Sequence, residues 1–105
     1  MDYKVIIAPR AISDLRDIVL YVSPERPEAA KRLGYALIEK TKVLSSFPRS
    51  GKIVREFSDP NIRQLVLPPY RIIYRIDDTL RVVGVARYWH GAQSNLGSSE
   101  LSEDA

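Results

Sequence analysis

The amino-acid sequence predicts a small α+β protein in which a helical hairpin packs on one face of a mainly antiparallel, twisted sheet. Two observations predict this fold class. Between residues 9 and 44, apolar side chains recur at helical spacing, as on one side of an amphipathic helix. From residue 53 onward, short β-branched and aromatic runs alternate with polar turns, as in antiparallel strands. A β-rich run at residues 3–7 precedes the helices, so the expected order of elements is β-α-α-β-β-β-β.

Both helices are expected to begin at prolines. Pro9 ends the first β-rich run and can occupy the first turn of a helix, where its missing N–H costs nothing. Pro24 and Pro27 predict a short link and the start of the second helix. The apolar stripes contain Ile12, Leu15, Val19 and Val22 in the first helix and Ala30, Leu33, Leu37, Thr41 and Leu44 in the second. Two amphipathic helices joined by a short link predict an αα-hairpin whose stripes need a sheet to cover.

The remaining strands are expected at residues 53–57, 62–67 and in a β-hairpin over residues 70–91. A three-residue turn at 77–79 would gather on one face of this hairpin Arg71, Arg75, Arg81, Arg87 and Trp89, together with Ile73, Val83 and Val85. The other face would be nearly free of charge. A two-residue turn would mix arginines into both faces, and burying an unpaired arginine is expensive. We therefore predict that the helices cover the uncharged face and that the arginine-rich face is a binding surface.

Composition bounds the class of protein. The chain of 105 residues is long enough for one hydrophobic core, so we expect a single domain at residues 1–94 and a polar, acidic, disordered tail at residues 95–105. It contains no cysteine, which excludes disulfides and thiolate metal sites and fits a reducing compartment. No apolar run is long enough to span a bilayer, and no signal peptide is visible. The sequence predicts a cytoplasmic protein without a membrane partner.

Charge is unevenly distributed along the chain. The net charge is +3, but residues 98–105 contain three acids and no base, so residues 1–97 carry 16 basic against 10 acidic side chains, or +6. Eleven of the 16 basic residues are arginine, which suits bidentate contacts to phosphate or carboxylate. This balance indicates a nucleic acid or an acidic protein as partner. One histidine, five glycines and no cysteine leave no material for a metal site or a nucleotide-binding loop, so we expect no cofactor.

Four segments together resemble a known family. They are Pro9–Ile18, Phe47-Pro48 with Gly51, Tyr70–Ile76 and Arg87–Gly91. In this order they resemble the RelE/ParE superfamily of toxins from bacterial type II toxin–antitoxin systems, which include plasmid-stabilisation modules. The resemblance covers roughly residues 3–94 and implies the fold expected above. It also implies a cognate antitoxin that binds and blocks the toxin in a hetero-oligomer.

The resemblance leaves the target open. ParE-like members inhibit DNA gyrase without being enzymes, whereas RelE-like members are endoribonucleases that cut messenger RNA on the ribosome. The helix start, the Pro48/Gly51 loop and the terminal His90-Gly91 look closer to the ParE-like branch, although Ala92-Gln93 replace the basic residue that often follows. Our first hypothesis is therefore a gyrase inhibitor, and the alternative is a ribosome-dependent nuclease. A third hypothesis is a non-toxic remnant that only binds its antitoxin.

The nuclease alternative implies specific site residues. Arg71 matches an active-site arginine of RelE-like nucleases, and Arg87 on the same predicted face could assist it. His90 lies near the position of a terminal tyrosine or histidine, and Glu56 and Lys52 lie near an acidic base and a basic residue. Each residue also has a plainer interpretation: His90 as an ordinary strand-end residue on the other face, Glu56 as a partner of Arg55 or Arg63, Trp89 as cover for the core rather than a platform for a base. The wider candidate binding set is Lys52, Arg71, Arg75, Arg81, Arg87 and Trp89.

Overall fold

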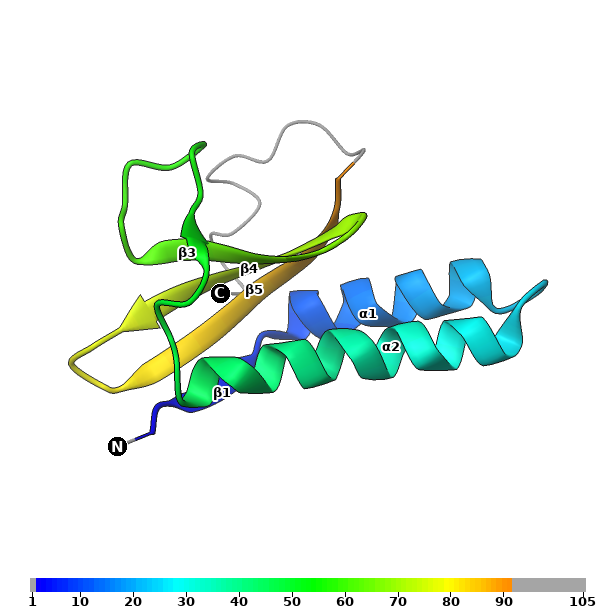
Figure 1. Cartoon of the computed structure of the whole chain (residues 1–105), viewed down its shortest axis with the longest axis horizontal. Helices are drawn as coiled ribbons and strands as arrows, with labels where there is room; N and C mark the ends of the chain where they lie inside the picture. The colour runs from blue at the N-terminus through cyan, green and yellow to red at the C-terminus, as the bar shows by residue number, and fades with distance from the viewer. Residues whose placement is uncertain (1, 92–105) are drawn as a thin grey trace.

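The computed structural model describes residues 2–91 of the chain. Its elements are β1 (Lys4–Ile7), α1 (Pro9–Val22), α2 (Pro27–Lys42), the short 3-10 turn η1 (Val43–Ser45), β2 (Lys52–Ile53), β3 (Ile62–Leu67), β4 (Tyr70–Asp77) and β5 (Val82–His90). The five strands form one sheet in the order β1-β5-β4-β3-β2. The strand β1 runs parallel to β5, and the other neighbours are antiparallel. Two helices on a mixed five-stranded sheet confirm the predicted α+β class and element order (Figure 1).

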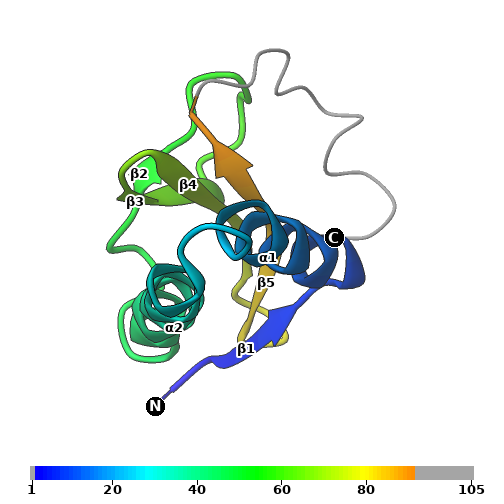
Figure 2. The same cartoon turned by 90° about the vertical axis from the view of Figure 1, so that its right-hand side faces the viewer.

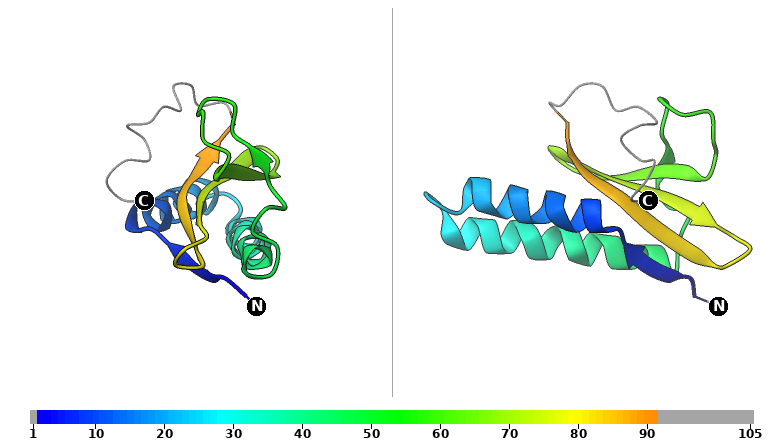
Figure 3. Two further views of the ribbon diagram at one scale, coloured as in Figure 1. Left: turned by 90° about the vertical axis from the view of Figure 1, so that its left-hand side faces the viewer. Right: turned by 180° about the vertical axis from the view of Figure 1, so that it is seen from behind.

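The two helices lie side by side along one side of the sheet. Figure 2 shows them nearly end-on, and Figure 3 shows the same arrangement from two further sides. Both begin with proline in the first turn, as the sequence predicts, and neither has a side-chain hydrogen bond at its N-cap. The main core lies between the helices and the sheet and is built from Ala11, Leu37, Leu44, Tyr70, Ile72, Tyr74, Ile76, Val83, Val85 and Tyr88. We call this side of the sheet the helix-covered face and the opposite side the outer face.

The turn of the β4–β5 hairpin differs from the prediction. Asp77 pairs with Val82, so the loop contains the four residues 78–81 rather than three. The Asp77 side chain accepts a hydrogen bond from the backbone N–H of Leu80 at 2.9 Å, and Arg81 closes the loop with a positive φ of 53°. Without a glycine in Asp77-Asp78-Thr79, the sequence has no local signal that selects the shorter turn. Arg81 therefore belongs to the loop and not to a strand.

Beyond a β-bulge, odd-numbered residues again pair with odd-numbered ones, as predicted, although the partners themselves differ from the predicted ones. The register shifts between Ile73, which pairs with Arg87, and Tyr74, which pairs with Val85, so β5 contains one extra residue at this point. One extra residue reverses which side chains point to each face. Val83 and Val85 consequently lie in the main core, although the sequence placed them on the arginine-rich face.

The outer face has a smaller core of its own. Val54, Ile62, Ile73, Ala86 and Trp89 form a second buried cluster, with Phe57 packed against it. The sequence predicted a strand over 53–57, but β2 ends at Ile53, and the backbone N–H of Phe57 bonds back to the carbonyl of Val54 at 3.2 Å. This turn brings two apolar side chains onto the outer face, where a continued strand would have alternated them.

The predicted tail at residues 95–105, and the last residues of the predicted domain, lie outside the described residues. Among residues 2–91, no helix combines the length and the apolar character needed to cross a membrane.

Candidate functional site

The register places most of the predicted binding residues on the outer face. Arg71 pairs with Trp89, Ile73 with both Gln64 and Arg87, and Gln64 with Lys52, so these side chains share a face with Arg75. Arg81 is the exception and corrects the prediction. Its guanidinium lies 4.7 Å above the ring of Tyr3, which packs against the main core. The four-residue loop takes Arg81 out of the strand alternation.

Arg71 is engaged with two neighbours from other elements. Its Nε donates to Oε1 of Gln64 on β3, and its two terminal nitrogens each lie 3.2 Å from a carboxylate oxygen of Glu56. The bidentate pair with Arg71 lowers the pKa of Glu56 below its ordinary value of 4.5. Glu56 therefore does not pair with Arg55 or Arg63, the plainer interpretation of the sequence. It is an ionised carboxylate that holds the cation in place.

Arg87 is buried and bound to helix α1. Its Nε and a terminal nitrogen donate to the Asp14 carboxylate at 2.8 and 3.0 Å, and the same carboxylate accepts the backbone N–H of Tyr88 at 3.0 Å. The register of β1 with β5 stops at Val85, so β5 has a free edge beyond that residue. The Asp14 carboxylate therefore accepts a backbone N–H of this edge and neutralises the arginine at the same time. Sequence reasoning missed this role, because nothing local connects a helical aspartate to a strand 73 residues later.

Neither Trp89 nor His90 is placed to act on a substrate beside Arg71. Trp89 is only 3% exposed within the outer-face cluster, and the guanidinium of Arg87 lies 4.9 Å from its ring. The interpretation of Trp89 as cover for a core is therefore confirmed, and a base cannot stack on it. His90 pairs with Tyr70, and the two rings meet edge-on at 5.2 Å on the helix-covered face. His90 thus lies on the opposite side of the sheet from Arg71.

The structure therefore brings together only part of the candidate nuclease set. Arg71 and Glu56 are in contact, whereas Arg87 is held by Asp14 and His90 is on the other face. Among residues 2–91, no group of three or more His, Cys, Asp or Glu side chains is arranged to hold a metal ion. Arg71 and Arg87 are thus each paired with a carboxylate, whereas Lys52 and Arg75 are exposed.

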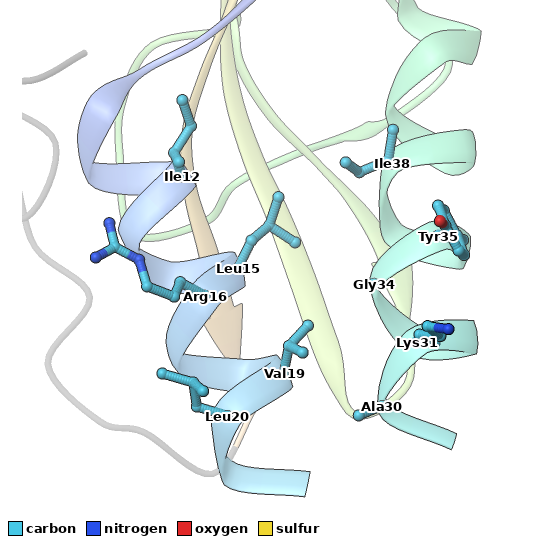
Figure 4. Close-up of a pocket in the computed structure, with 10 residues that line it drawn as sticks. All are labelled: Ile12, Leu15, Arg16, Val19, Leu20, Ala30, Lys31, Gly34, Tyr35 and Ile38. Carbon is cyan, nitrogen blue, oxygen red and sulfur yellow. The ribbon is translucent and has the colours of Figure 1, made fainter. Parts of the chain in front are cut away.

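A groove of about 440 Å³ lies between the two helices and was not foreseen from the sequence. Figure 4 shows Leu15 and Val19 of α1 and Ile38 of α2 pointing toward one another across it. Leu20 and Tyr35 are 60% and 69% exposed at its borders. The basic side chains Arg16 and Lys31 also border it, and no acidic residue is among those that line it. The sequence did contain a signal, since the apolar stripes of both helices are wider than one buried face needs.

Comparison with known proteins decides the family. A family model described as the ParE toxin of the type II toxin–antitoxin system parDE matches residues 5–95. This chain belongs to the RelE/ParE superfamily of type II toxin–antitoxin toxins. It is 30% identical over 97 residues to the toxin RelE1 of Caulobacter vibrioides, covering 89% of this chain and 98% of that relative. The resemblance identified in the sequence is thereby confirmed.

Solved structures agree on the fold. A toxin-antitoxin complex RelBE2 from Mycobacterium tuberculosis contains a chain with 28% identity and a TM-score of 0.65, covering 86% of this chain and 99% of that one. A chromosomal ParDE system from P. aeruginosa contains a chain with 23% identity and a TM-score of 0.68, covering 84% and 95%. One solved relative is a ParDE system and the other a RelBE complex, so these similarities show the fold and leave the target open.

Proposed function

We propose that this toxin acts as a ParE-like inhibitor that binds DNA gyrase in the cytoplasm, and that a cognate antitoxin neutralises it. The observation that supports a non-enzymatic mode of action is the engagement of Arg71 by Glu56 and Gln64, with His90 on the opposite face of the sheet. The match of residues 5–95 to the ParE toxin model supports gyrase as the target.

Metal-free RNA cleavage needs a base for the 2′-hydroxyl proton, an acid for the leaving oxygen and a cation for the phosphate. An efficient base has a pKa near the working pH, and the pairing with Arg71 moves the pKa of Glu56 in the other direction. The only histidine of the chain would have to reach around the sheet to meet Arg71. The described residues thus favour an inhibitor that works by binding.

The groove between α1 and α2 fits the antitoxin. Its apolar walls match the apolar side of an amphipathic helix, a recurring mode of peptide recognition. Arg16 and Lys31 at its borders would pair with acidic residues of the bound segment. Two of the solved relatives are described as toxin-antitoxin systems or complexes. The segment in the groove would anchor the antitoxin, and the rest of the antitoxin would block the target.

The experiment that tests the function separates the two targets. The chain is expressed from an inducible promoter in bacteria, and the purified toxin is added to a gyrase supercoiling assay. We expect growth arrest and inhibited supercoiling, with no new cleavage sites in messenger RNA mapped by primer extension. Unchanged supercoiling together with ribosome-dependent cleavage would replace this proposal by the RelE-like alternative, in which Arg71 would hold the phosphate. In that case, Arg71→Ala should abolish the cleavage.

The antitoxin site has its own matched pair of variants. Leu20→Asp places a carboxylate in the groove, while Leu80→Asp makes the same change in the β4–β5 loop, where the leucine is similarly exposed. We expect Leu20→Asp to weaken binding of the antitoxin about tenfold or more, because it sets a charge against the apolar side of the bound helix, and Leu80→Asp to leave the binding unchanged. Equal binding by both variants would place the antitoxin elsewhere.

A further inference from the structure

Gly84 occupies an unusual position for a glycine. It lies in the interior of β5, on the outer face, between Arg75 on β4 and Ile6 on β1. Glycine weakens a strand interior, because it loses more backbone freedom on folding and has no side chain to pack. A glycine at such a position often marks a bulge, a bend or the close approach of another backbone or ligand.

Residues 2–91 show no steric or backbone requirement for this glycine. No glycine of the described residues has a positive φ, and the bulge of the hairpin lies at Ile73/Tyr74 rather than at Gly84. A Cβ atom built on Gly84 would have no atom of the described residues within 4 Å, whereas one built on Gly51 would meet the Gln64 carbonyl oxygen at 2.4 Å. The close approach of a group outside residues 2–91 would account for a glycine here.

The surroundings of Gly84 form an open platform. The loop that carries Val54 and Phe57 covers the far half of the outer face but leaves this half uncovered. Alternation along the strands places six side-chain positions here, which we call the Gly84 platform: Lys4, Ile6, Arg75, Asp77, Val82 and Gly84. Ile6 is 46% exposed, and Lys4, Arg75 and Asp77 are also exposed.

We propose that the Gly84 platform is the surface with which this toxin binds its protein target. Building on the proposed function, this inference names the surface that would touch the target. A backbone segment or small side chain of the target lies over Gly84, Ile6 supplies an apolar contact, and a carboxylate of the target pairs with Arg75. Arginine beside apolar side chains is a typical interface composition.

The chemistry of the platform favours a protein over a nucleic acid. None of its six residues is aromatic, so it offers no ring on which a base would stack. The Asp77 carboxylate, two positions from Arg75 on β4, adds a negative charge to this face, which a phosphate backbone would have to approach. A protein surface with mixed charges can satisfy both signs. The groove proposed for the antitoxin lies between the helices, so the two surfaces belong to different layers of the molecule.

The test is a graded series at one position, Gly84→Ala, Gly84→Val and Gly84→Trp, where a Cβ atom has no atom of the described residues within 4 Å. Thermal unfolding is expected to remain cooperative for Gly84→Val, with a midpoint no lower than that of the wild type. The toxin concentration that halves gyrase supercoiling, and the inducer concentration that arrests growth, are expected to rise with side-chain size, by about tenfold or more for Gly84→Val. Binding of the antitoxin should not change.

Charge supplies a second, independent variant. Arg75→Glu should lose inhibition to a similar extent, because it repels the expected carboxylate. Arg32→Glu makes the same change at an exposed position on α2 and should retain both inhibition and antitoxin binding.

Each outcome separates this inference from the proposed function. If Gly84→Val and Gly84→Trp inhibit supercoiling as strongly as the wild type, the platform is not the target surface, while the gyrase proposal stands. If the wild type arrests growth without affecting gyrase, the gyrase proposal fails, and the growth arrest of the Gly84 series still decides the platform. A wild type that neither arrests growth nor binds gyrase would overturn both. If the wild type alone binds DNA or RNA, with no protein present, and Gly84→Val does not, the partner of the platform is a nucleic acid and not a protein.

Discussion

The two halves of the outer face were expected to behave alike but differ in what covers them. In the half that the loop after β2 covers, which we call the closed half, Trp89 belongs to the buried cluster with Val54, and Phe57 packs against it. Arg71 and Arg87 of this half are each bound to a carboxylate. In the open half, the Gly84 platform has an exposed Arg75 and no covering segment among the described residues. The same strands thus carry structural arginines at one end and an available one at the other.

This difference teaches that an arginine-rich strand face is not by itself a binding surface. The function of each arginine depends on whether a carboxylate from a distant element reaches it. Asp14 of α1 reaches Arg87, and Glu56 from the loop after β2 reaches Arg71. Once its guanidinium is paired with such a carboxylate, the arginine has fewer donors left for a partner, and removing it would leave the carboxylate without its cation.

The largest expected effect contrasts Arg87 with Arg75. Arg87→Ala leaves the buried Asp14 carboxylate without its cation, and we expect the free energy of unfolding to fall by about 3–5 kcal/mol, the usual cost of breaking a buried ion pair. Arg75→Ala removes an exposed side chain and should cost no more than about 0.5 kcal/mol. Urea unfolding of both variants measures the difference. Equal losses of unfolding free energy in the two variants would show that Arg75 is as much a structural residue as Arg87.

Gly84→Val should change stability in the opposite direction. Valine fits a strand better than glycine, and its side chain has free space here, so we expect the free energy of unfolding to rise by roughly 0.5–1 kcal/mol. The measurement is urea unfolding at neutral pH. A clear loss of stability would mean that the open half is more tightly packed than the structure indicates.

The pair of Glu56 and Arg71 should give a smaller, pH-dependent effect. Because the folded-state pKa of Glu56 is lowered, its contribution is complete above the unfolded value near 4.5 and is lost as the pH falls through the folded value. Glu56→Gln should cost about 0–1 kcal/mol at pH 7, since the pair is partly exposed, and next to nothing at low pH. Urea unfolding between pH 7 and pH 3 tests this. A cost that does not shrink with falling pH would contradict it.

The smallest effect on stability is expected from Asp78, in the loop of the β4–β5 hairpin. Arg49 first, and then Tyr3, lower the pKa of Asp78 from 3.8 to about 2 through hydrogen bonds to its carboxylate. This exposed contribution should be complete above about pH 4 and lost between pH 4 and pH 2. Asp78→Asn and Arg49→Ala should each flatten the fall in thermal midpoint over that window. If neither does, the contact does not persist in solution.

Much of the fold could be predicted from the sequence because local chemistry specifies it. Pro9 and Pro27 mark the helix starts, helical spacing of apolar residues identifies both helices, and β-branched runs identify β3, β4 and β5. The uncharged face under the helices was predicted correctly for Ile72, Tyr74, Ile76 and Tyr88. These features depend on residues a few positions apart, whose spacing is visible in the sequence.

Only the tertiary structure decided how the candidate site is built. The four-residue loop and the bulge set which faces Arg81, Val83 and Gly84 occupy, and the sequence has no glycine in the turn to indicate them. The partners of Arg71 and Arg87 come from 15 and 73 residues away, and the groove needs both helices in contact. Spacing along the chain determines which side chains share one helix or strand. Which side chains meet between elements depends on register and packing, and these are set by the whole core at once.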